Sequence, residues 1–341
     1  MKPLGMRLVI AALVVLFSSA SIHSFDFGPR PLFAFMQFDH DRSIYMMYSY
    51  QYIAFNALTA GEQPVEGRGV ETTDVTDSFQ PHHSLTLSTD LLFGVDTALG
   101  YMTNRFNEQQ EDSIPYDEVT AELRQPVEGV EGAMAGRTSY WYARYRRVSQ
   151  DVSTNYRVRS GVYSSTVETL DYPARLDFVK LGGLATQDIT GSGMDLGEIY
   201  MGLTYVRLST SIPGFAEGGE LASESLSGDS LGLAFAGSAS VMQPFTEPRV
   251  FSPYLTLGYA ATFFGVSRMN DSWATGVSFG PSVQAGEGIF DGSFELGLGM
   301  FISDIVRMDA NAYFNGVVIN KNDYEQILGQ GGVGISVEFG I

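Results

Sequence analysis

The chain contains 341 residues and no cysteine, and its 39 acidic and 20 basic side chains give a formal charge of −19. The acidic balance argues against a nucleic-acid partner, which requires a basic surface, and the absence of cysteine excludes disulfide scaffolds, thiolate metal sites and cysteine nucleophiles. Charged residues make up only 17% of the chain and aromatic residues 13%, so it is not a disordered acidic polymer. The length fits either two domains or one large all-β barrel.

The N-terminus has the composition of a cleaved signal peptide, which we expect to span residues 1–20. Lys2 and Arg7 provide a positive start, ten apolar residues follow at 8–17, and Ser18, Ser19 and Ala20 are small. Because a membrane-spanning helix needs about 20 apolar residues, this segment favours export over anchoring. We expect residues 21–43 to form an N-terminal arm or a first strand.

From residue 85 onward, apolar residues alternate with small or polar ones. Between 85 and 101 the odd positions are mostly apolar, and the same two-residue period returns over 231–241, 255–263, 273–279, 294–302 and 333–341. Since successive side chains of a strand point to opposite faces, each segment would have one apolar face and one small or polar face.

Two features favour a membrane barrel over a soluble β-sandwich. The segments are about 10 to 14 residues long, whereas strands of soluble sheets are usually about 5 or 6. Their second face is rich in Gly, Ala, Ser, Thr, Asp and Glu, which makes a poor sandwich core but suits a barrel lumen. We therefore predict an all-β fold, a transmembrane antiparallel up-and-down β-barrel over residues 44–341.

Bacterial barrels have an even number of strands, and we predict 12 to 14. The candidate strands are 44–56, 84–92, 93–103, 139–149, 155–165, 175–185, 195–209, 229–242, 251–264, 272–284, 292–302, 305–315 and 331–341, with 33–39 as a possible addition. We expect acidic loops near 57–83, 105–138 and 210–228. These loops would be solvated; binding of divalent cations by their carboxylates is the alternative.

The last predicted strand places apolar residues at every second position: Val333, Ile335, Val337, Phe339 and Ile341. In this it resembles the final strand of Gram-negative outer-membrane proteins, which carries their assembly signal, although those chains usually end on an aromatic residue. The resemblance implies a location in the cell outer membrane, contact with the lipid bilayer and lipopolysaccharide, and recognition by the barrel-assembly machinery. A homo-oligomer is also possible. No motif identifies a subfamily.

Six of the seventeen arginines lie between residues 137 and 159. If the chain turned at residues 151–152, facing residues would pair Arg144 with Arg159 and Arg146 with Arg157 on one face. We predict that these four line the lumen and control selectivity. The acidic segment 107–131 would fold inward as counter-charge, with Glu108, Glu111, Asp112, Asp117 and Glu118 as candidates. That arrangement resembles the constriction of general porins. The alternative is that the arginines reach lipid headgroups or pair on the rim.

A catalytic site is not expected, and neither is a cofactor or a metal. His82 and Ser84, with Asp96 downstream, resemble the His-x-Ser arrangement of outer-membrane phospholipases and lipid A deacylases. However, all three residues have even numbers, which places them on the small, polar face of the predicted strands, away from lipid. Outer-membrane acyl hydrolysis is therefore a remote alternative.

The predicted function is a passive, porin-like channel for small hydrophilic solutes. The main alternative is a structural, adhesive or surface-recognition barrel without transport. Fold class alone does not decide between them.

Overall fold

In a computed structural model, the described residues are 44–65, 68–75, 80–92, 95–105, 115–127, 137–159, 165–188, 196–215, 221–242, 252–270, 272–278, 284–286, 288–303, 306–321 and 324–340. The predicted signal peptide, the segment 21–43 and the possible strand 33–39 lie outside these ranges. Within the described ranges, no helix is long and apolar enough to cross a membrane.

Nearly all described residues lie in strands. Their bounds are β1 Ile44–Val65, β2 Arg68–Val75, β3 Gln80–Leu92, β4 Val95–Thr103, β5 Tyr116–Pro126, β6 Arg137–Arg159, β7 Ser165–Asp188, β8 Leu196–Phe215, β9 Leu221–Met242, β10 Ser252–Met269, β11 Ser272–Ser278, β12 Gln284–Gly286, β13 Gly288–Ser303, β14 Val306–Lys321 and β15 Tyr324–Gly340.

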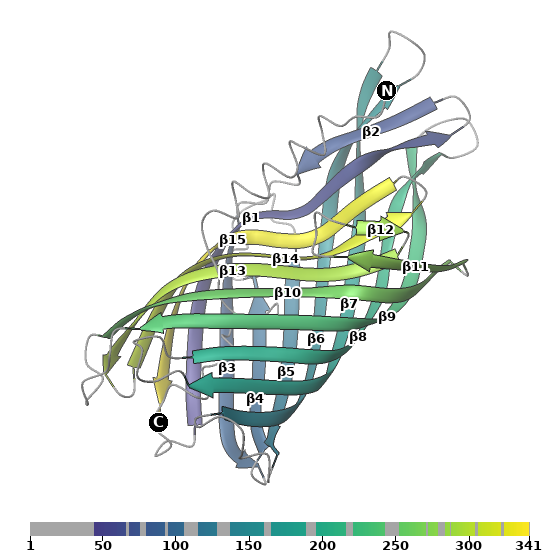
Figure 1. Cartoon of the computed structure of the whole chain (residues 1–341). Coiled ribbons are helices and arrows are strands. Elements are labelled where there is room, and N and C mark those ends of the chain that lie inside the picture. Colours follow the sequence, from purple (N-terminus) through teal and green to yellow (C-terminus); the bar gives the residue numbers. More distant parts are fainter. Residues whose placement is uncertain are drawn as a thin grey trace.

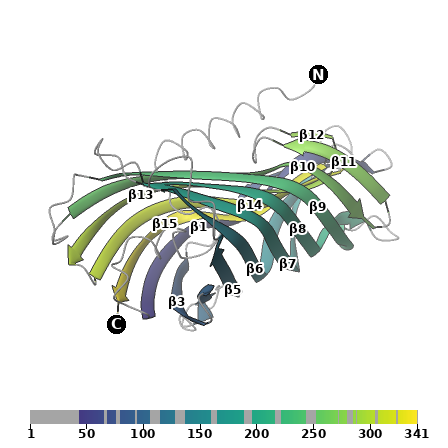
Figure 2. The same ribbon diagram turned by 60° about the horizontal axis from the view of Figure 1, so that its bottom comes forward.

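Among the described residues, twelve strands form a closed ring in which every pairing is antiparallel (Figure 1). Its order is β1, β3, β4, β5, β6, β7, β8, β9, β10, β13, β14, β15. The first and last strands close it, with Tyr45 opposite Gly340 at one end of the pairing and Gly61 opposite Tyr324 at the other. Figure 2 shows the sheet curling back on itself. The predicted up-and-down barrel is confirmed, at the lower limit of the predicted strand number.

Three shorter strands lengthen one end of this ring. β2 pairs with β1 and, through residues 69–71, with β6. β11 pairs with the last part of β10, and β12 pairs with β11. We call this the long-strand end. The other end, where β1 begins and β15 finishes, is the termini end, and Figure 1 shows the C-terminus there.

The structure corrects several predicted boundaries. Residues 116–126, predicted to lie in an acidic loop, form the wall strand β5. The predicted strand 139–149 and residues 155–159 of the predicted strand 155–165 belong to the single 23-residue strand β6, and residue 165 begins β7. The acidic stretch 57–83 is mostly strand, in β1, β2 and β3, and β8 and β9 extend into 210–228. The predicted strand 272–284 is divided between β11 and β12. Charge was the misleading cue, because it marks lumen positions and strand extensions as well as loops.

Along the wall, exposed apolar side chains alternate with buried small or polar ones, as predicted. On β3, Leu85 and Leu87 are about half exposed whereas Ser84, Thr86 and Ser88 are buried. The apolar outer face continues around the barrel, for example at Leu99, Leu123, Leu181, Leu203, Leu233, Leu257, Leu298 and Ile335. Such a continuous apolar outer wall is the surface that a transmembrane barrel presents to lipid.

This outer apolar wall ends sharply on β6 to β10. One hydrogen-bonded register passes from Arg147 to Asp177, Arg207, Asp229 and Arg268, one residue on each successive strand. We call these five residues the boundary row. Towards the termini end their outward neighbours are apolar or aromatic. Towards the long-strand end they are polar, as at Ser149, Asp171, Ser209 and Ser227.

Inside the barrel the polarity changes in the opposite direction. Beyond the boundary row, the inward side chains form an apolar core that includes Val148, Leu176, Leu208 and Leu226. Phe178 and Val206 extend this core one residue towards the termini end, to the level of Arg146. On the termini side of the boundary row, the buried inward residues include the polar and charged Arg144, Arg146, Lys180 and Thr204. The strands therefore continue past the boundary as a sheet with a water-exposed outside and an apolar inside.

The start of β13 and the last part of β14 lie inside the barrel and complete the apolar core. Residues 288–291 and 317–319, which we call the inner plug, are buried on both faces. Ser230 Oγ on β9 donates a hydrogen bond to the Ile289 carbonyl (3.0 Å), and the Ile289 N–H donates one to Ser267 Oγ on β10 (3.0 Å). A Cβ at Gly228 would lie 2.6 Å from Ile289 Cδ1, so glycine permits this close approach. The plug and core occupy the lumen at the long-strand end.

Candidate functional site

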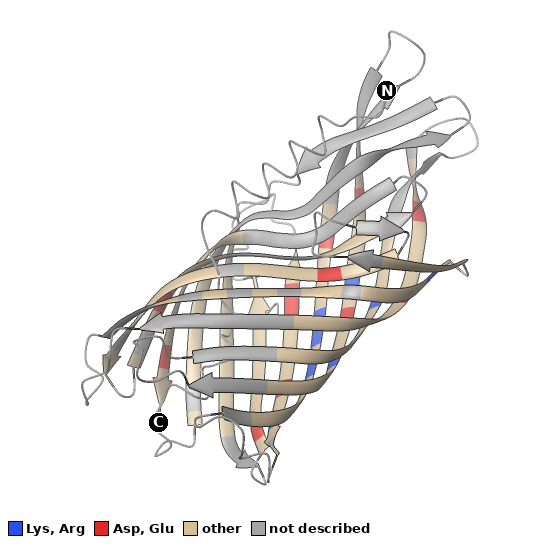
Figure 3. Cartoon of the chain, viewed as in Figure 1, with Lys and Arg blue, Asp and Glu red and all other residues tan. Residues whose placement is uncertain are grey.

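Seven charged side chains meet inside the barrel, next to the apolar core. They are Glu118, Glu122 and Arg124 on β5, Arg144 and Arg146 on β6, Lys180 on β7, and Asp291 on the plug segment of β13. We call this set the charged layer. All seven residues are at least nine-tenths buried. Figure 3 shows positive and negative segments interleaved along the middle of the wall.

The contact with the most hydrogen bonds in the charged layer joins neighbouring strands β5 and β6. Arg146 donates two hydrogen bonds to Glu118, from Nε to Oε1 and from Nη2 to Oε2, both 2.9 Å long. The Tyr116 hydroxyl donates a third to Glu118 Oε2 at 2.5 Å, and the guanidinium lies 5.1 Å from the centre of the Phe178 ring. A two-pronged arginine–carboxylate pair fixes both side chains in one orientation.

A second group is centred on Glu122. Arg124 Nε donates to Glu122 Oε1 at 2.8 Å, and Arg144 Nη1 lies 3.6 Å from Glu122 Oε2. One carboxylate thus lies between two guanidinium groups, so this part of the charged layer carries an excess of positive charge.

The third contact crosses the lumen. Lys180 Nζ on β7 lies 3.0 Å from Asp291 Oδ2 on the inner plug, and Thr262 on β10 donates a hydrogen bond to Asp291 Oδ1. β7 and β13 are four positions apart in the ring by the shorter route, so the ion pair connects separate parts of the wall. It ties the inner plug to the charged layer.

The structure places the four predicted arginines differently from the hairpin that the sequence led us to expect. No turn occurs at residues 151–152, because β6 is continuous, so the predicted pairing of Arg144 with Arg159 and Arg146 with Arg157 is wrong. Arg144 faces Glu122 and Lys180 in the register, and Arg146 faces Thr120 and Phe178. Arg157 and Arg159 lie further along β6 at odd positions, opposite β2 residues Glu71 and Gly69.

The acidic candidates also separate. Glu118 supplies counter-charge to Arg146, but as part of wall strand β5 and not as an inserted loop. Asp117 lies on the outer face of β5, opposite to that of Glu118, and beyond the outer apolar wall. It forms an ion pair with Arg105. Burial raises the pKa of Asp117, but hydrogen bonds from Tyr101, Thr103 and Arg105 outweigh it and hold that pKa below its ordinary value. Glu108, Glu111 and Asp112 lie outside the described residues.

The residues predicted to signal assembly lie along β15, which closes the barrel against β1. Val333, Ile335 and Phe339 are exposed on its outer face, and Val337 is half-buried there. Ile341 lies outside the described residues. Their role in assembly remains a prediction.

The His-x-Ser residues do not form a catalytic group with Asp96. His82 and Ser84 are buried on the inner face, where the Ser84 hydroxyl contacts the Ser49 hydroxyl and the His82 ring packs edge-on against Tyr116. Ser84 faces Met102 on β4, six residues from Asp96, a separation of roughly 20 Å along the strand. Among the described residues, no group of three or more His, Asp or Glu side chains is placed to hold a metal ion.

Sequence reasoning missed Glu122, Arg124, Lys180 and Asp291. The first two alternate with apolar residues in 116–126, so a period count there would have identified the strand. Lys180 was missed because, within its predicted strand, the other residues on its face are small or apolar and give no sign of a charged site. Asp291 gave no sequence cue, because only the inward course of β13 brings it to Lys180.

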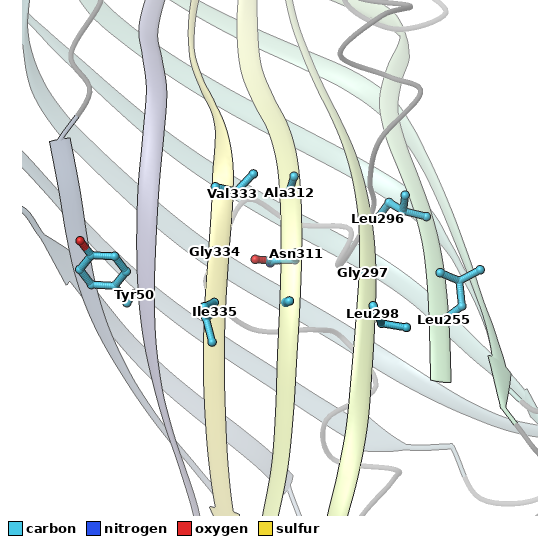
Figure 4. Close-up of a pocket in the computed structure, with 11 residues that line it drawn as sticks. Tyr50, Leu255, Leu296, Gly297, Leu298, Asn311, Ala312, Val333, Gly334 and Ile335 are labelled. Atoms are coloured by element: carbon cyan, nitrogen blue, oxygen red, sulfur yellow. The ribbon is translucent and has the colours of Figure 1, made fainter. Parts of the chain in front are cut away.

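A separate concavity lies on the outer wall, with a volume of about 450 Å³. Its floor includes Ala310 and Ala312 on β14, between larger side chains of the flanking strands such as Leu298 and Ile335 (Figure 4). The lining is mainly apolar and at outward positions, so this groove is part of the lipid-facing surface and is distinct from the charged layer.

No family model matches the sequence, and no curated protein matches it. Solved structures with a similar fold include the translocator domain of the autotransporter NalP from Neisseria meningitidis, at 12% identity and a TM-score of 0.39, covering 89% of this chain and 91% of that one. The β domain of the Bordetella autotransporter BrkA has 8% identity and a TM-score of 0.42, covering 88% and 100%. The Ralstonia pickettii toluene transporter TbuX has 8% identity and a TM-score of 0.38, covering 88% and 90%. These similarities are too distant to bear on function.

Proposed function

We propose that the chain is an outer-membrane channel for small hydrophilic solutes whose resting lumen is closed by the inner plug. The observation that carries this proposal is the charged layer at membrane depth. Replacing a buried ion pair with well-packed apolar residues is often neutral or stabilising, so seven buried charges are poorly explained by stability alone. A lumen that admits water and solutes when the plug moves gives those charges a use.

In this channel Arg144 and Arg146 act on passing ions. With Arg124 and Lys180 they supply four positive charges, against the carboxylates of Glu118, Glu122 and Asp291. Ion pathways lined by basic side chains favour anions. The open channel is therefore expected to prefer anions weakly, because most of its charge is internally paired.

The proposed orientation places the termini end in the periplasm. Outer-membrane barrels have short periplasmic turns and longer extracellular segments. The turns between β3 and β4 and between β13 and β14 are short and lie at the termini end, while strands such as β7 continue well past the boundary row at the other end.

Conductance in planar bilayers tests the proposal. Wild type is expected to open rarely, whereas Asp291→Asn, which breaks the Lys180 contact to the plug, should open more often. Arg144→Gln combined with Arg146→Gln, measured in the Asp291→Asn background, should shift selectivity towards cations. A Leu203→Ala variant on the lipid face serves as the matched control. Absence of channel steps from every variant would contradict the channel.

A surface-recognition role is the second candidate, and the extension beyond the boundary row favours it. There the strands enclose their own apolar core and present polar residues outward, which suits a platform that meets other molecules. Folded protein without conductance in any variant, together with binding to a surface ligand, would favour this function instead.

A further inference from the structure

The outer face at the boundary row carries more positive than negative charge. Arg147, Arg207 and Arg268 alternate with Asp177 and Asp229, and Arg175 lies two residues from Asp177 on the same strand. The described patch thus holds four arginines and two aspartates. None of these residues faces the lumen, so the channel proposal gives them no role.

The guanidinium groups remain accessible at this surface. The side chains of Arg147, Arg175 and Arg207 are 44%, 52% and 70% exposed, although each has a carboxylate within 4.0 Å, and Arg268 is also exposed. Exposed ion pairs of this kind contribute little to stability, because water screens both charges. Fold stability is therefore a weak explanation for the cluster.

The aspartates hold the patch in place. The Tyr145 hydroxyl donates to Asp177 Oδ1 at 2.7 Å, and the Tyr205 hydroxyl donates to Asp229 Oδ1 at 2.6 Å. Each tyrosine lies two residues from the arginine of the boundary row on its own strand, on the lipid side of the row. Each aspartate thus connects an aromatic ring at the membrane edge with arginine side chains just outside it.

The spacing of the arginines suits phosphate groups. Arg147, Arg207 and Arg268 lie on every second strand of one register, about 10 Å apart between backbones. Arginine side chains can converge across such a gap, and their planar donors match phosphate oxygens. The apolar wall on the termini side of the patch would contact the acyl chains of the same lipid.

The surface on the long-strand side of the patch is polar. On the long-strand side the outward residues are rich in hydroxyl and carboxylate groups, including Ser149, Thr169, Asp171, Ser209, Ser225 and Ser227. Sugar hydroxyls can hydrogen-bond to such a surface, whereas a small glycerol headgroup would not extend along it.

We propose that this patch binds the phosphates of a phosphorylated glycolipid in the membrane leaflet at the long-strand end. The acyl chains lie against the apolar wall of β6 to β10, the phosphates lie between the arginines, and the sugars lie along the polar extension. This site is independent of the channel and does not require conductance.

Titration of the purified full chain in detergent with bisphosphorylated lipid A, followed by native mass spectrometry, tests the site. The same lipid without phosphates and phosphatidylglycerol are the comparison probes. Wild type should prefer the bisphosphorylated glycolipid to both. Arg207→Gln combined with Arg268→Gln should weaken its binding about ten-fold, and Asp229→Asn should strengthen it, because charge-assisted contacts to phosphate dominate.

Arg105→Gln is the matched control, since Arg105 is also exposed near the lipid boundary but lies outside the patch. It should leave binding unchanged. Heat-modifiable migration on gels verifies that each variant is folded. If the double variant does not fold, two other measurements test the site. The single variant Arg268→Gln must bind the bisphosphorylated glycolipid more weakly than wild type, and added salt must weaken binding by wild type. Equal binding of phosphatidylglycerol would overturn the choice of a glycolipid, and unaltered binding by the arginine variants would overturn the site.

Discussion

Strands β6 to β9 pass through two regions that use the same two-residue period in opposite ways. On β8, within the membrane-facing region, Leu203 points outward and is 48% exposed while Thr204 points inward. Five residues further along, Leu208 points inward and is 1% exposed, and Ser209 points outward. The strand does not change register between them. What changes is the surrounding medium, from lipid to water, and with it the face on which an apolar side chain is favourable.

Breaking the principal ion pair of the membrane region should have the largest effect. Glu118→Gln leaves Arg146 with a buried charge that has lost its carboxylate, and such a change costs about 3 to 5 kcal/mol. Urea unfolding followed by heat-modifiable migration measures it. Glu118→Leu combined with Arg146→Met should recover most of the loss; an equally unstable double variant would mean that the pair itself is required for folding.

An arginine introduced at two outward positions of β8 would test the boundary directly. Leu203→Arg places a charge against lipid and should destabilise the barrel by about 2 to 4 kcal/mol in bilayers, depending on its depth. Ser209→Arg, six residues away on the same face, lies in water and should change stability by less than about 0.5 kcal/mol. Similar losses at the two positions would show that the boundary row does not mark the edge of the membrane.

A small effect, comparable with that of Ser209→Arg, is expected at the exposed ion pair beyond the lipid wall. Arg105→Gln removes one partner of Asp117, and because water screens this exposed pair the loss of stability should be far smaller than that of Glu118→Gln in the same unfolding assay. Because the folded-state pKa of Asp117 is lowered, its contribution is present above the ordinary value of 3.8 and is lost as the pH falls through the folded-state pKa. The difference between wild type and Arg105→Gln should therefore shrink under strongly acidic conditions. A difference that grows on acidification would contradict this ion pair.

The lumen was partly predictable. Parity placed Ser84 and Thr86 inside, and the density of arginines drew attention to Arg144 and Arg146. The partners of those arginines were not predictable in detail, because the acidic content of 116–126 resembled a loop and concealed β5. The predicted hairpin at 151–152 failed for a related reason: beyond the boundary row every second residue of β6 from Ser149 to Asn155 is polar, and such residues are also common in turns.

The sequence by itself determined the strand period, the apolar outer wall and the all-β class, since these depend only on local alternation and on the need to satisfy backbone groups in lipid. It could not determine which charges meet. Lys180 and Asp291 are more than one hundred residues apart, and only the closure of the ring and the inward course of β13 bring them together. The boundary row likewise arises from register across five strands, a property of the assembled sheet that no single segment contains.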